Sequence, residues 1–298
     1  MATINEILKV IDKSVIDFNE SIPKVQQQLF DDITELASKL DTRNGRIQAS
    51  AKNIRLIGQI KSRFERLITK NKAYKQRVKT FTEAFDEVSK LQNQFFAETV
   101  KEYSSPKTLE AIRQESVQAT IENLNSVSRR IAEPIRDILR TNITSGAKFT
   151  DLTKGLREFL LDTKTGEGQL VKHVKQITTD ALNQYARTNL ETITNDLGLE
   201  WFSYVGAIID TSRPFCVAMH EKKYFHKSEI PKLLKGDFEE FDGTIDKKTG
   251  LPSGMIEGTN ENNFLINLGG WNCNHQAIPV NELAVPASVK KSFAGTSP

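Results

Sequence analysis

The chain has few of the features that mark a secreted or membrane-spanning protein. Its 298 residues include only 2 cysteines, too few for a disulfide framework. No long apolar run opens the chain, because Glu6, Lys9 and Asp12 lie among the first apolar positions. We therefore expect a soluble protein that is made in a cytoplasm and has no membrane partner.

A strong charge of one sign is also missing. The 41 lysines and arginines are nearly balanced by 38 aspartates and glutamates, which leaves a net charge of only +3. This balance predicts no global field that would attract a nucleic acid or a membrane, so any basic surface must be local. The hydrophobic content of 38% is enough for a folded core, which excludes wholesale disorder.

Apolar residues recur three and four positions apart in the front part of the chain, the spacing of amphipathic helices. One apolar seam runs from Ile4 to Leu40 and contains Pro23, where we expect a kink or a break. The polar stretch Asp41–Gly45 predicts a turn. A second seam follows from Ile57 to Phe95, with the polar Asn71 at an apolar position.

Two long seams separated by a turn predict an antiparallel helical hairpin or coiled coil over residues 1–105. Asn71 would fix the register of this hairpin. The turn-like sequence Tyr103–Pro106 ends it. Renewed helical periodicity predicts a helical section over residues 106–197, and Gly198 stops its last helix.

After that glycine the composition changes, which predicts a small mixed α/β module over residues 198–298. Trp201–Ile209 is rich in aromatic and β-branched residues and predicts a strand buried on both faces. Phe264–Leu268 predicts a second short strand, whereas the polar run Asp242–Asn263 suits loops. The expected fold class is therefore α-rich α+β.

Two short pairs of metal-binding residues lie in this module. Cys216 and His220 are one helical turn apart, and Cys273 and His275 are two positions apart in a segment that we expect to be extended. Zinc prefers thiolate and imidazole ligands in tetrahedral geometry, and binding would stabilise a small region rich in loops. The pairs predict one structural zinc ion. The alternative is two ordinary buried cysteines with histidines nearby by chance.

Short motifs surround these pairs, in a fixed order along the chain. They are Ala186-Arg187-Thr188, then Asp210-Thr211-Ser212-Arg213-Pro214-Phe215-Cys216, and then Trp271-Asn272-Cys273-Asn274-His275. Over roughly residues 115–280 the chain thereby resembles the phage Mu protein-F-like head morphogenesis family. Members of that family carry a late Cys-Arg-Cys motif, where this chain has Cys-Asn-His, and a second cysteine or histidine where it has His220. Both departures exchange one zinc ligand type for another, which favours the metal interpretation.

The resemblance implies a bacteriophage minor capsid or head morphogenesis protein. Such a protein would be a low-copy structural component of the virion, associated with the portal, capsid or scaffold protein and in contact with packaged DNA. It would not be an enzyme. One alternative is a phage-borne effector enzyme, either a nuclease or an ADP-ribosyltransferase, and another is a bacterial coiled-coil adaptor.

The polar residues of the motifs have simple structural interpretations. Arg187 is expected to form a buried ion pair. Asp210 follows the expected strand and can cap a turn, and Arg213 can pair with it or with Glu221. Trp271 belongs to the same structural set. In the enzyme alternative, Asp210 and Arg213 would instead act with His220 and His226, although no nucleophile, base and orienting group occur together at motif spacing.

One cluster of basic residues stands out in the front part of the chain. It could bind DNA phosphates or an acidic protein surface. No aromatic residues are interleaved for base stacking, which favours a solvated helix face instead. The candidates for contact are Lys52, Arg55, Lys61, Arg63, Arg66, Lys70 and Lys72.

Overall fold

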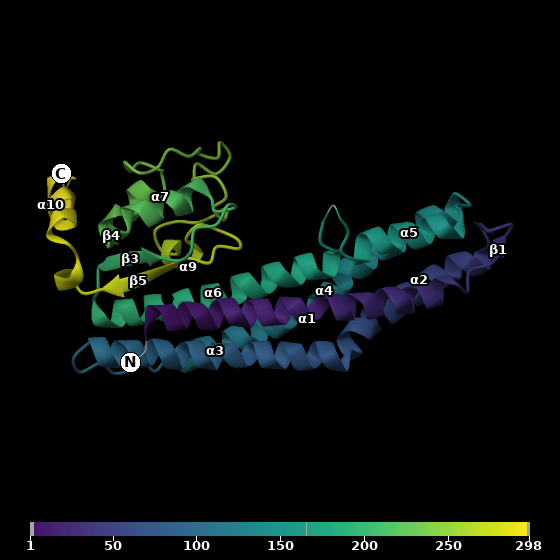
Figure 1. Ribbon diagram of the computed structural model, residues 1–298, viewed down its shortest axis with the longest axis horizontal. Coiled ribbons are helices and arrows are strands. Elements are labelled where there is room, and N and C mark those ends of the chain that lie inside the picture. Colours follow the sequence, from purple (N-terminus) through teal and green to yellow (C-terminus); the bar gives the residue numbers. More distant parts are fainter. Residues whose placement is uncertain (1–2, 165, 297–298) are drawn as a thin grey trace. The chain divides into compact units, whose positions relative to one another are not determined.

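The computed structural model describes residues 3–164 and 166–296, and in it long helices precede a small module that contains a sheet (Figure 1). This confirms the α-rich α+β class. The front elements are α1 (Ile4–Ala37), β1 (Thr42–Arg43), β2 (Arg46–Ile47), α2 (Ala51–Lys70), α3 (Lys72–Thr99), α4 (Leu109–Thr144), α5 (Phe149–Leu160) and α6 (Gln169–Leu197). Across both described ranges, we find no helix with the length and apolar character needed to cross a membrane.

The turn after α1 is a short hairpin whose strands β1 and β2 pair antiparallel, with Thr42 opposite Ile47. Asn44 and Gly45 form its tip, with φ values of 52° and 72°. Two consecutive left-handed residues are what a type I′ turn requires, and Asn-Gly adopts them at the lowest cost. The turn predicted at Asp41–Gly45 is therefore confirmed.

The break expected at Pro23 does not occur, because α1 continues through it. The neighbouring apolar residues Ile22 and Val25 are only 0% and 4% exposed. The hydroxyl of Ser21 donates a hydrogen bond to the carbonyl of Phe18 in the preceding turn, at 2.6 Å. Burial of the apolar face on both sides of the proline offsets the backbone hydrogen bond that the proline cannot make.

Asn71 separates two helices, where the sequence predicted one long seam with a polar register residue. α2 ends at Lys70, and the Asn71 amide donates to the carbonyl of Ile68. The Asn71 side-chain oxygen then accepts a hydrogen bond from the backbone amide of Tyr74 at 2.9 Å, which caps the start of α3. The first hundred or so residues therefore contain three helices, not the two of the predicted hairpin.

The chain folds into two compact units, each built from segments that are not consecutive. One unit comprises residues 1–12, 84–116 and 179–298, and the other comprises residues 13–83 and 117–178. The helices α1, α3, α4 and α6 each contribute residues to both. The boundaries of these units differ from the expected domain ranges 1–105, 106–197 and 198–298. Within those expected ranges, residues 1–2, 165 and 297–298 lie outside the described residues.

Contacts between distant segments explain why the first hundred residues do not form a unit of their own. Within the second unit, the phenol of Tyr74 donates to the carbonyl of Leu124 at 2.9 Å, in a buried position. Within the first unit, the side-chain amide of Gln92 donates to the carbonyl of Ala186 at 2.9 Å. The helix α3 is thus in contact with the later helices α4 and α6 through buried side chains.

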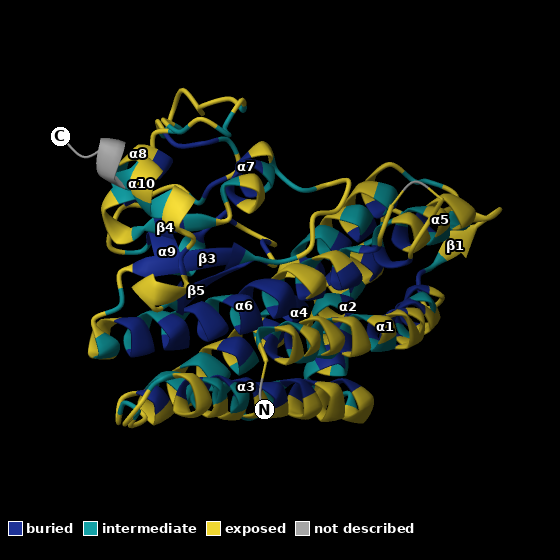
Figure 2. Cartoon of the chain, turned by 60° about the vertical axis from the view of Figure 1, so that its left-hand side comes forward, coloured by how far each residue is buried: buried dark blue, intermediate teal, exposed yellow. Residues whose placement is uncertain are grey.

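The C-terminal part of the first unit holds a three-stranded antiparallel sheet in the order β4-β3-β5. In the register, Trp201 lies opposite His226 on one side and Val280 on the other. The central strand is buried along nearly its whole length, as predicted, and is dark blue in Figure 2. The elements of this part are β3 (Trp201–Val205), α7 (Pro214–Lys222), β4 (Tyr224–His226), η1 (Lys227–Glu229), α8 (Ile230–Leu233), α9 (Phe264–Asn267), β5 (Gln276–Val280), η2 (Glu282–Ala284) and α10 (Ala287–Thr296).

Two predictions for this module were wrong in detail. The strand expected over Trp201–Ile209 ends at Val205, because Gly206 has a φ of 142° and the chain leaves the sheet there. The second strand expected at Phe264–Leu268 is the short helix α9, closed by a hydrogen bond from the Leu268 amide to the Phe264 carbonyl. A short apolar run fits a buried helical turn as well as a strand, and here packing selects the turn.

Candidate metal centre

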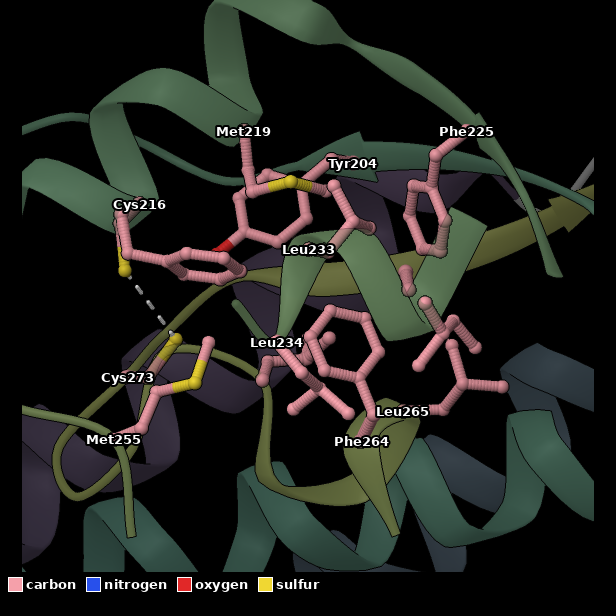
Figure 3. Packing of buried hydrophobic residues seen from close by; sticks show 14 of the residues in the cluster. Tyr204, Cys216, Met219, Phe225, Leu233, Leu234, Met255, Phe264, Leu265 and Cys273 are labelled. Atoms are coloured by element: carbon pink, nitrogen blue, oxygen red, sulfur yellow. Dashed lines mark hydrogen bonds between the residues drawn. The ribbon is translucent and has the colours of Figure 1, made fainter. Parts of the chain in front are cut away.

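Three of the four predicted ligands come together in the module. Cys216 lies on α7, and Cys273 and His275 lie just before β5. The two sulfur atoms are 4.0 Å apart, and Cys273 Sγ is 3.7 Å from His275 Nδ1. The three side chains form a group whose ligand atoms all lie within 4.8 Å of one another, and Figure 3 shows the two sulfurs facing each other. This group could hold a metal ion.

The electrostatic environment of the two thiols favours one thiolate. The hydrogen bond between them raises the pKa of Cys216, and burial raises it further. The same hydrogen bond holds the pKa of Cys273 well below its usual range, with help from the guanidinium of Arg187 and from His275. The thiolate is the form that binds metals, so the lowered pKa of Cys273 favours the binding of a cation by this pair of cysteines.

The surrounding backbone leaves room beside the sulfurs. A side chain at Gly269 would clash with Cys216 Sγ and would place its Cβ 3.2 Å from Cys273 Sγ. At Gly206, a Cβ would come within 2.7 Å of the His275 ring. Glycine at these two positions therefore lets the backbone approach the group closely.

The imidazole of His275 is enclosed and incompletely hydrogen-bonded. Its ring stacks on Tyr204, with the ring centres 5.1 Å apart and the planes 20° from parallel. His275 Nε2 is buried and has no hydrogen-bond partner among the described residues. Buried polar atoms are almost always paired, so the unpaired Nε2 leaves this imidazole incompletely satisfied, while its Nδ1 is the ring nitrogen that lies 3.7 Å from Cys273 Sγ.

His220, the fourth predicted ligand, does not join this group. It lies in the last turn of α7 and is exposed, whereas Cys216, Cys273 and His275 are only 2%, 4% and 4% exposed. Four residues of an α-helix rotate the side chain about 40° beyond a full turn. In α7 the residue one turn from Cys216 that faces the core is Met219, not His220.

Arg187 links α6 to the segment that carries two of the ligands. It is 3% exposed, and its guanidinium donates to the carbonyls of Ile266 at 3.0 Å, of His275 at 2.8 and 3.0 Å, and of Cys273. The prediction of a buried residue is confirmed. The predicted ion pair is wrong, because within the described residues the guanidinium forms no salt bridge and binds backbone carbonyls instead.

Two further residues of α6 hold the same segment, and sequence reasoning missed both. A carboxylate oxygen of Asp180 accepts a hydrogen bond from the Asn272 amide, and burial raises the pKa of this carboxyl. The side chain of Asn183 accepts a hydrogen bond from Gln276 at 2.9 Å. The only signal in the sequence was their spacing with Arg187, since positions three and four apart share one helix face.

No protein-family model, curated protein or solved structure matches this chain. The resemblance to the Mu protein-F-like family therefore depends on the motif residues alone.

The other motif residues have structural contacts that differ from those expected. Arg213 donates to the backbone carbonyl of Trp271 at 2.6 Å and pairs with neither Asp210 nor Glu221. Asp210 is exposed in the loop after β3, and the turn there is closed by the Ser212 hydroxyl, which accepts from the Ile209 amide. The indole of Trp271 is 46% exposed.

The residues of the enzyme alternative are spread over the module. His226 lies 3.4 Å from a Glu200 carboxylate oxygen, and its ring caps η1. Glu221 is exposed on α7. Arg213 is held by a backbone carbonyl, as described above. Each of these polar groups thus has a structural contact or faces solvent.

The seven basic candidates of the front part fall into two classes. Lys52 forms an ion pair with Asp41 at 2.6 Å, and Lys61 forms one with Glu133. The remaining five are exposed and form no ion pair with another described residue. They are Arg55, Arg63, Arg66, Lys70 and Lys72.

Proposed function

We propose that this chain is a minor head protein of a bacteriophage, a low-copy structural component that attaches to the portal or the inner capsid. The observation that carries the proposal is the convergence of the motif residues. Arg187 comes from α6, Cys216 from α7, and Cys273 and His275 from the segment before β5, yet all contribute to one buried cluster. Motif residues that contact one another in one buried cluster are what we expect of a structural module of that family.

A structural role is also supported by how the polar motif residues are used. Arg187 and Arg213 direct their guanidinium groups at backbone carbonyls, which positions loops and leaves no cation aimed at a substrate. A catalytic centre requires a nucleophile, a base and an orienting group within hydrogen-bond reach. The separate positions of Asp210, His226 and Glu221 fit a structural module better.

The metal of the module is, in this proposal, a zinc ion held by Cys216, Cys273 and His275. Two thiolates and an imidazole are a ligand set that zinc binds well, and zinc would supply folding free energy locally. A three-residue set leaves one coordination position for a water molecule, which is the arrangement of catalytic sites. Here the ligands are at most 4% exposed, so a substrate has no access and the role is structural.

The proposal is tested in virus particles. The chain should be present in purified particles at a few copies, measured by quantitative mass spectrometry, and should copurify with the portal protein of the same genome after coexpression. Particles without the chain would contradict the proposal. Turnover of nucleic acid or NAD that is lost in Glu221→Ala or His226→Ala variants would support the effector alternative instead.

A further inference from the structure

Two hollows lie side by side along α2, away from the metal centre. One has a volume of about 730 Å³ and lies where α1, the end of α2 and the start of α3 meet; the other has a volume of about 680 Å³ and lies between α1 and α2. Arg63 and Arg66 line both, so the two hollows are adjacent. All the lining residues belong to the second compact unit.

The lining of these hollows is strongly basic. Among the described residues that line them, Asp32 is the single carboxylate. The pKa of Asp32 is raised by burial and by the nearby Glu35, and lowered by Arg63, which places the arginine within its electrostatic reach. We call this surface the basic groove. Its cations are Lys39, Arg55, Arg63, Arg66, Lys70 and Lys72.

Five of these six cations come from the seven that the sequence predicted. Lys52 and Lys61, which the sequence placed in the same cluster, line neither hollow and are neutralised by Asp41 and Glu133. Lys39 is added from the turn that follows α1, a segment that the sequence prediction did not include in the cluster. In the described part of the chain, none of the six cations forms an ion pair within the protein. Uncompensated cations that gather along a concave surface attract an anion.

The length of the groove fits an extended polyanion. From Arg55 to Lys70 the helix rises about 22 Å, at about 1.5 Å per residue. A DNA duplex carries about one charge per 1.7 Å, so about 13 phosphate charges lie along that distance. A small anion would occupy only a fraction of this surface.

The hollow between α1 and α2 is lined by a glycine, Gly58, that helix formation does not explain. Gly58 is exposed in the middle of α2, where glycine costs about 1 kcal/mol relative to alanine. A Cβ at Gly58 would meet no other atom within 4 Å, so packing inside the protein does not require the glycine. The missing side chain leaves the backbone of α2 open to a ligand.

We propose that the basic groove binds the phosphate backbone of duplex DNA without reading its sequence. No aromatic side chain lines the two hollows among the described residues, so the groove offers no platform for the stacked bases of a single strand. Phosphate contacts need only cations at suitable spacing. The missing aromatic residues bear on base stacking and not on phosphate binding.

The test uses the full-length chain and fluorescence anisotropy. Two fluorescein-labelled duplexes of about 20 base pairs and unrelated sequence are titrated between about 50 and 200 mM salt, where phosphate contacts change the affinity strongly. We expect similar dissociation constants for both duplexes and weaker binding of a single strand. In an Arg63→Gln, Arg66→Gln variant, the slope of log affinity against log salt should fall by about 1.8. If the two curves meet near 1 M salt, affinity at about 0.1 M falls about 60-fold.

A matched variant removes the same charge elsewhere in the same unit. Lys79 and Lys154 are exposed and line neither hollow, so a Lys79→Gln, Lys154→Gln variant should keep the wild-type slope. Circular dichroism verifies that both variants are folded.

Several results would overturn the proposal. These are no duplex binding at about 50 mM salt, an equal loss of slope in both double variants, or displacement of the duplex by polyglutamate at equal charge concentration. The last result would assign the groove to an acidic protein. The outcome is independent of the proposed head function, because purified protein and synthetic DNA are used and incorporation into particles is not measured.

Discussion

Replacing Arg187 by methionine should destabilise the C-terminal module strongly. The change keeps an unbranched apolar stem and removes the guanidinium that binds three backbone carbonyls. The bonds to Cys273 and His275 are buried, and the bond to Ile266 is partly buried. An unpaired buried carbonyl costs about 1–3 kcal/mol. After allowing for the relief of a buried charge, we expect the free energy of unfolding to fall by about 3 kcal/mol.

Urea unfolding followed by tryptophan fluorescence measures this loss where it occurs. The chain has only 2 tryptophans, Trp201 on β3 and Trp271 beside the ligand segment, so the signal reports on the module. With a urea dependence of at most about 3 kcal/mol per M, the midpoint should move down by about 1 M or more. Far-ultraviolet circular dichroism follows the helices in parallel.

The control is Arg129→Met, since Arg129 is exposed on α4 and lies in the other compact unit. This substitution should leave the free energy of unfolding within about 0.5 kcal/mol of that of the wild type. If Arg187→Met shifted the midpoint no more than Arg129→Met, the carbonyl network would contribute nothing measurable, and the interpretation of Arg187 as the link to the ligand segment would be wrong.

Further substitutions test the metal centre and the helices. Elemental analysis of protein purified without added metal should find one zinc per chain, lost in Cys273→Ser and retained in His220→Ala; zinc-free wild-type protein with a chelator-resistant module would reject the site. Gly269→Ala should lower the zinc content, because its methyl group would press against Cys216 Sγ, whereas full occupancy would show that the backbone can give way. Phe85→Asp, at a position that is 0% exposed, should cost more than about 3 kcal/mol by burying a charge, and an unchanged thermal melt by circular dichroism would contradict this.

Local sequence patterns were sufficient for much of the secondary structure. The stop at Gly198 is confirmed by its φ of 62°, and the Asn44-Gly45 turn by two positive φ values. The last long helix of the predicted helical section runs from Gln169 to Leu197 and so ends directly before Gly198. These features follow from the conformational preferences of a few adjacent residues, which act wherever the segment lies in the fold.

The candidate site required information that no local pattern carries. Helical periodicity placed His220 on the same side as Cys216, but the side of α7 that faces Cys273 is set by packing against the sheet. In the same way, the partner of Arg213 is a carbonyl 58 residues away. The sequence identifies which side chains can bind a metal; which of them meet depends on the fold.

For the helices and the basic groove, too, some features follow from the sequence alone and others depend on the fold. The sequence alone determined that the first part of the chain is helical and that cations gather between residues 52 and 72. Only the tertiary structure decided that Lys52 and Lys61 are neutralised by acids and that Lys39 joins the groove from the turn after α1. The physical reason is that helix formation depends on neighbours along the chain. Burial, ion pairing and ligand geometry depend on neighbours in space, and those are fixed only when distant segments pack together.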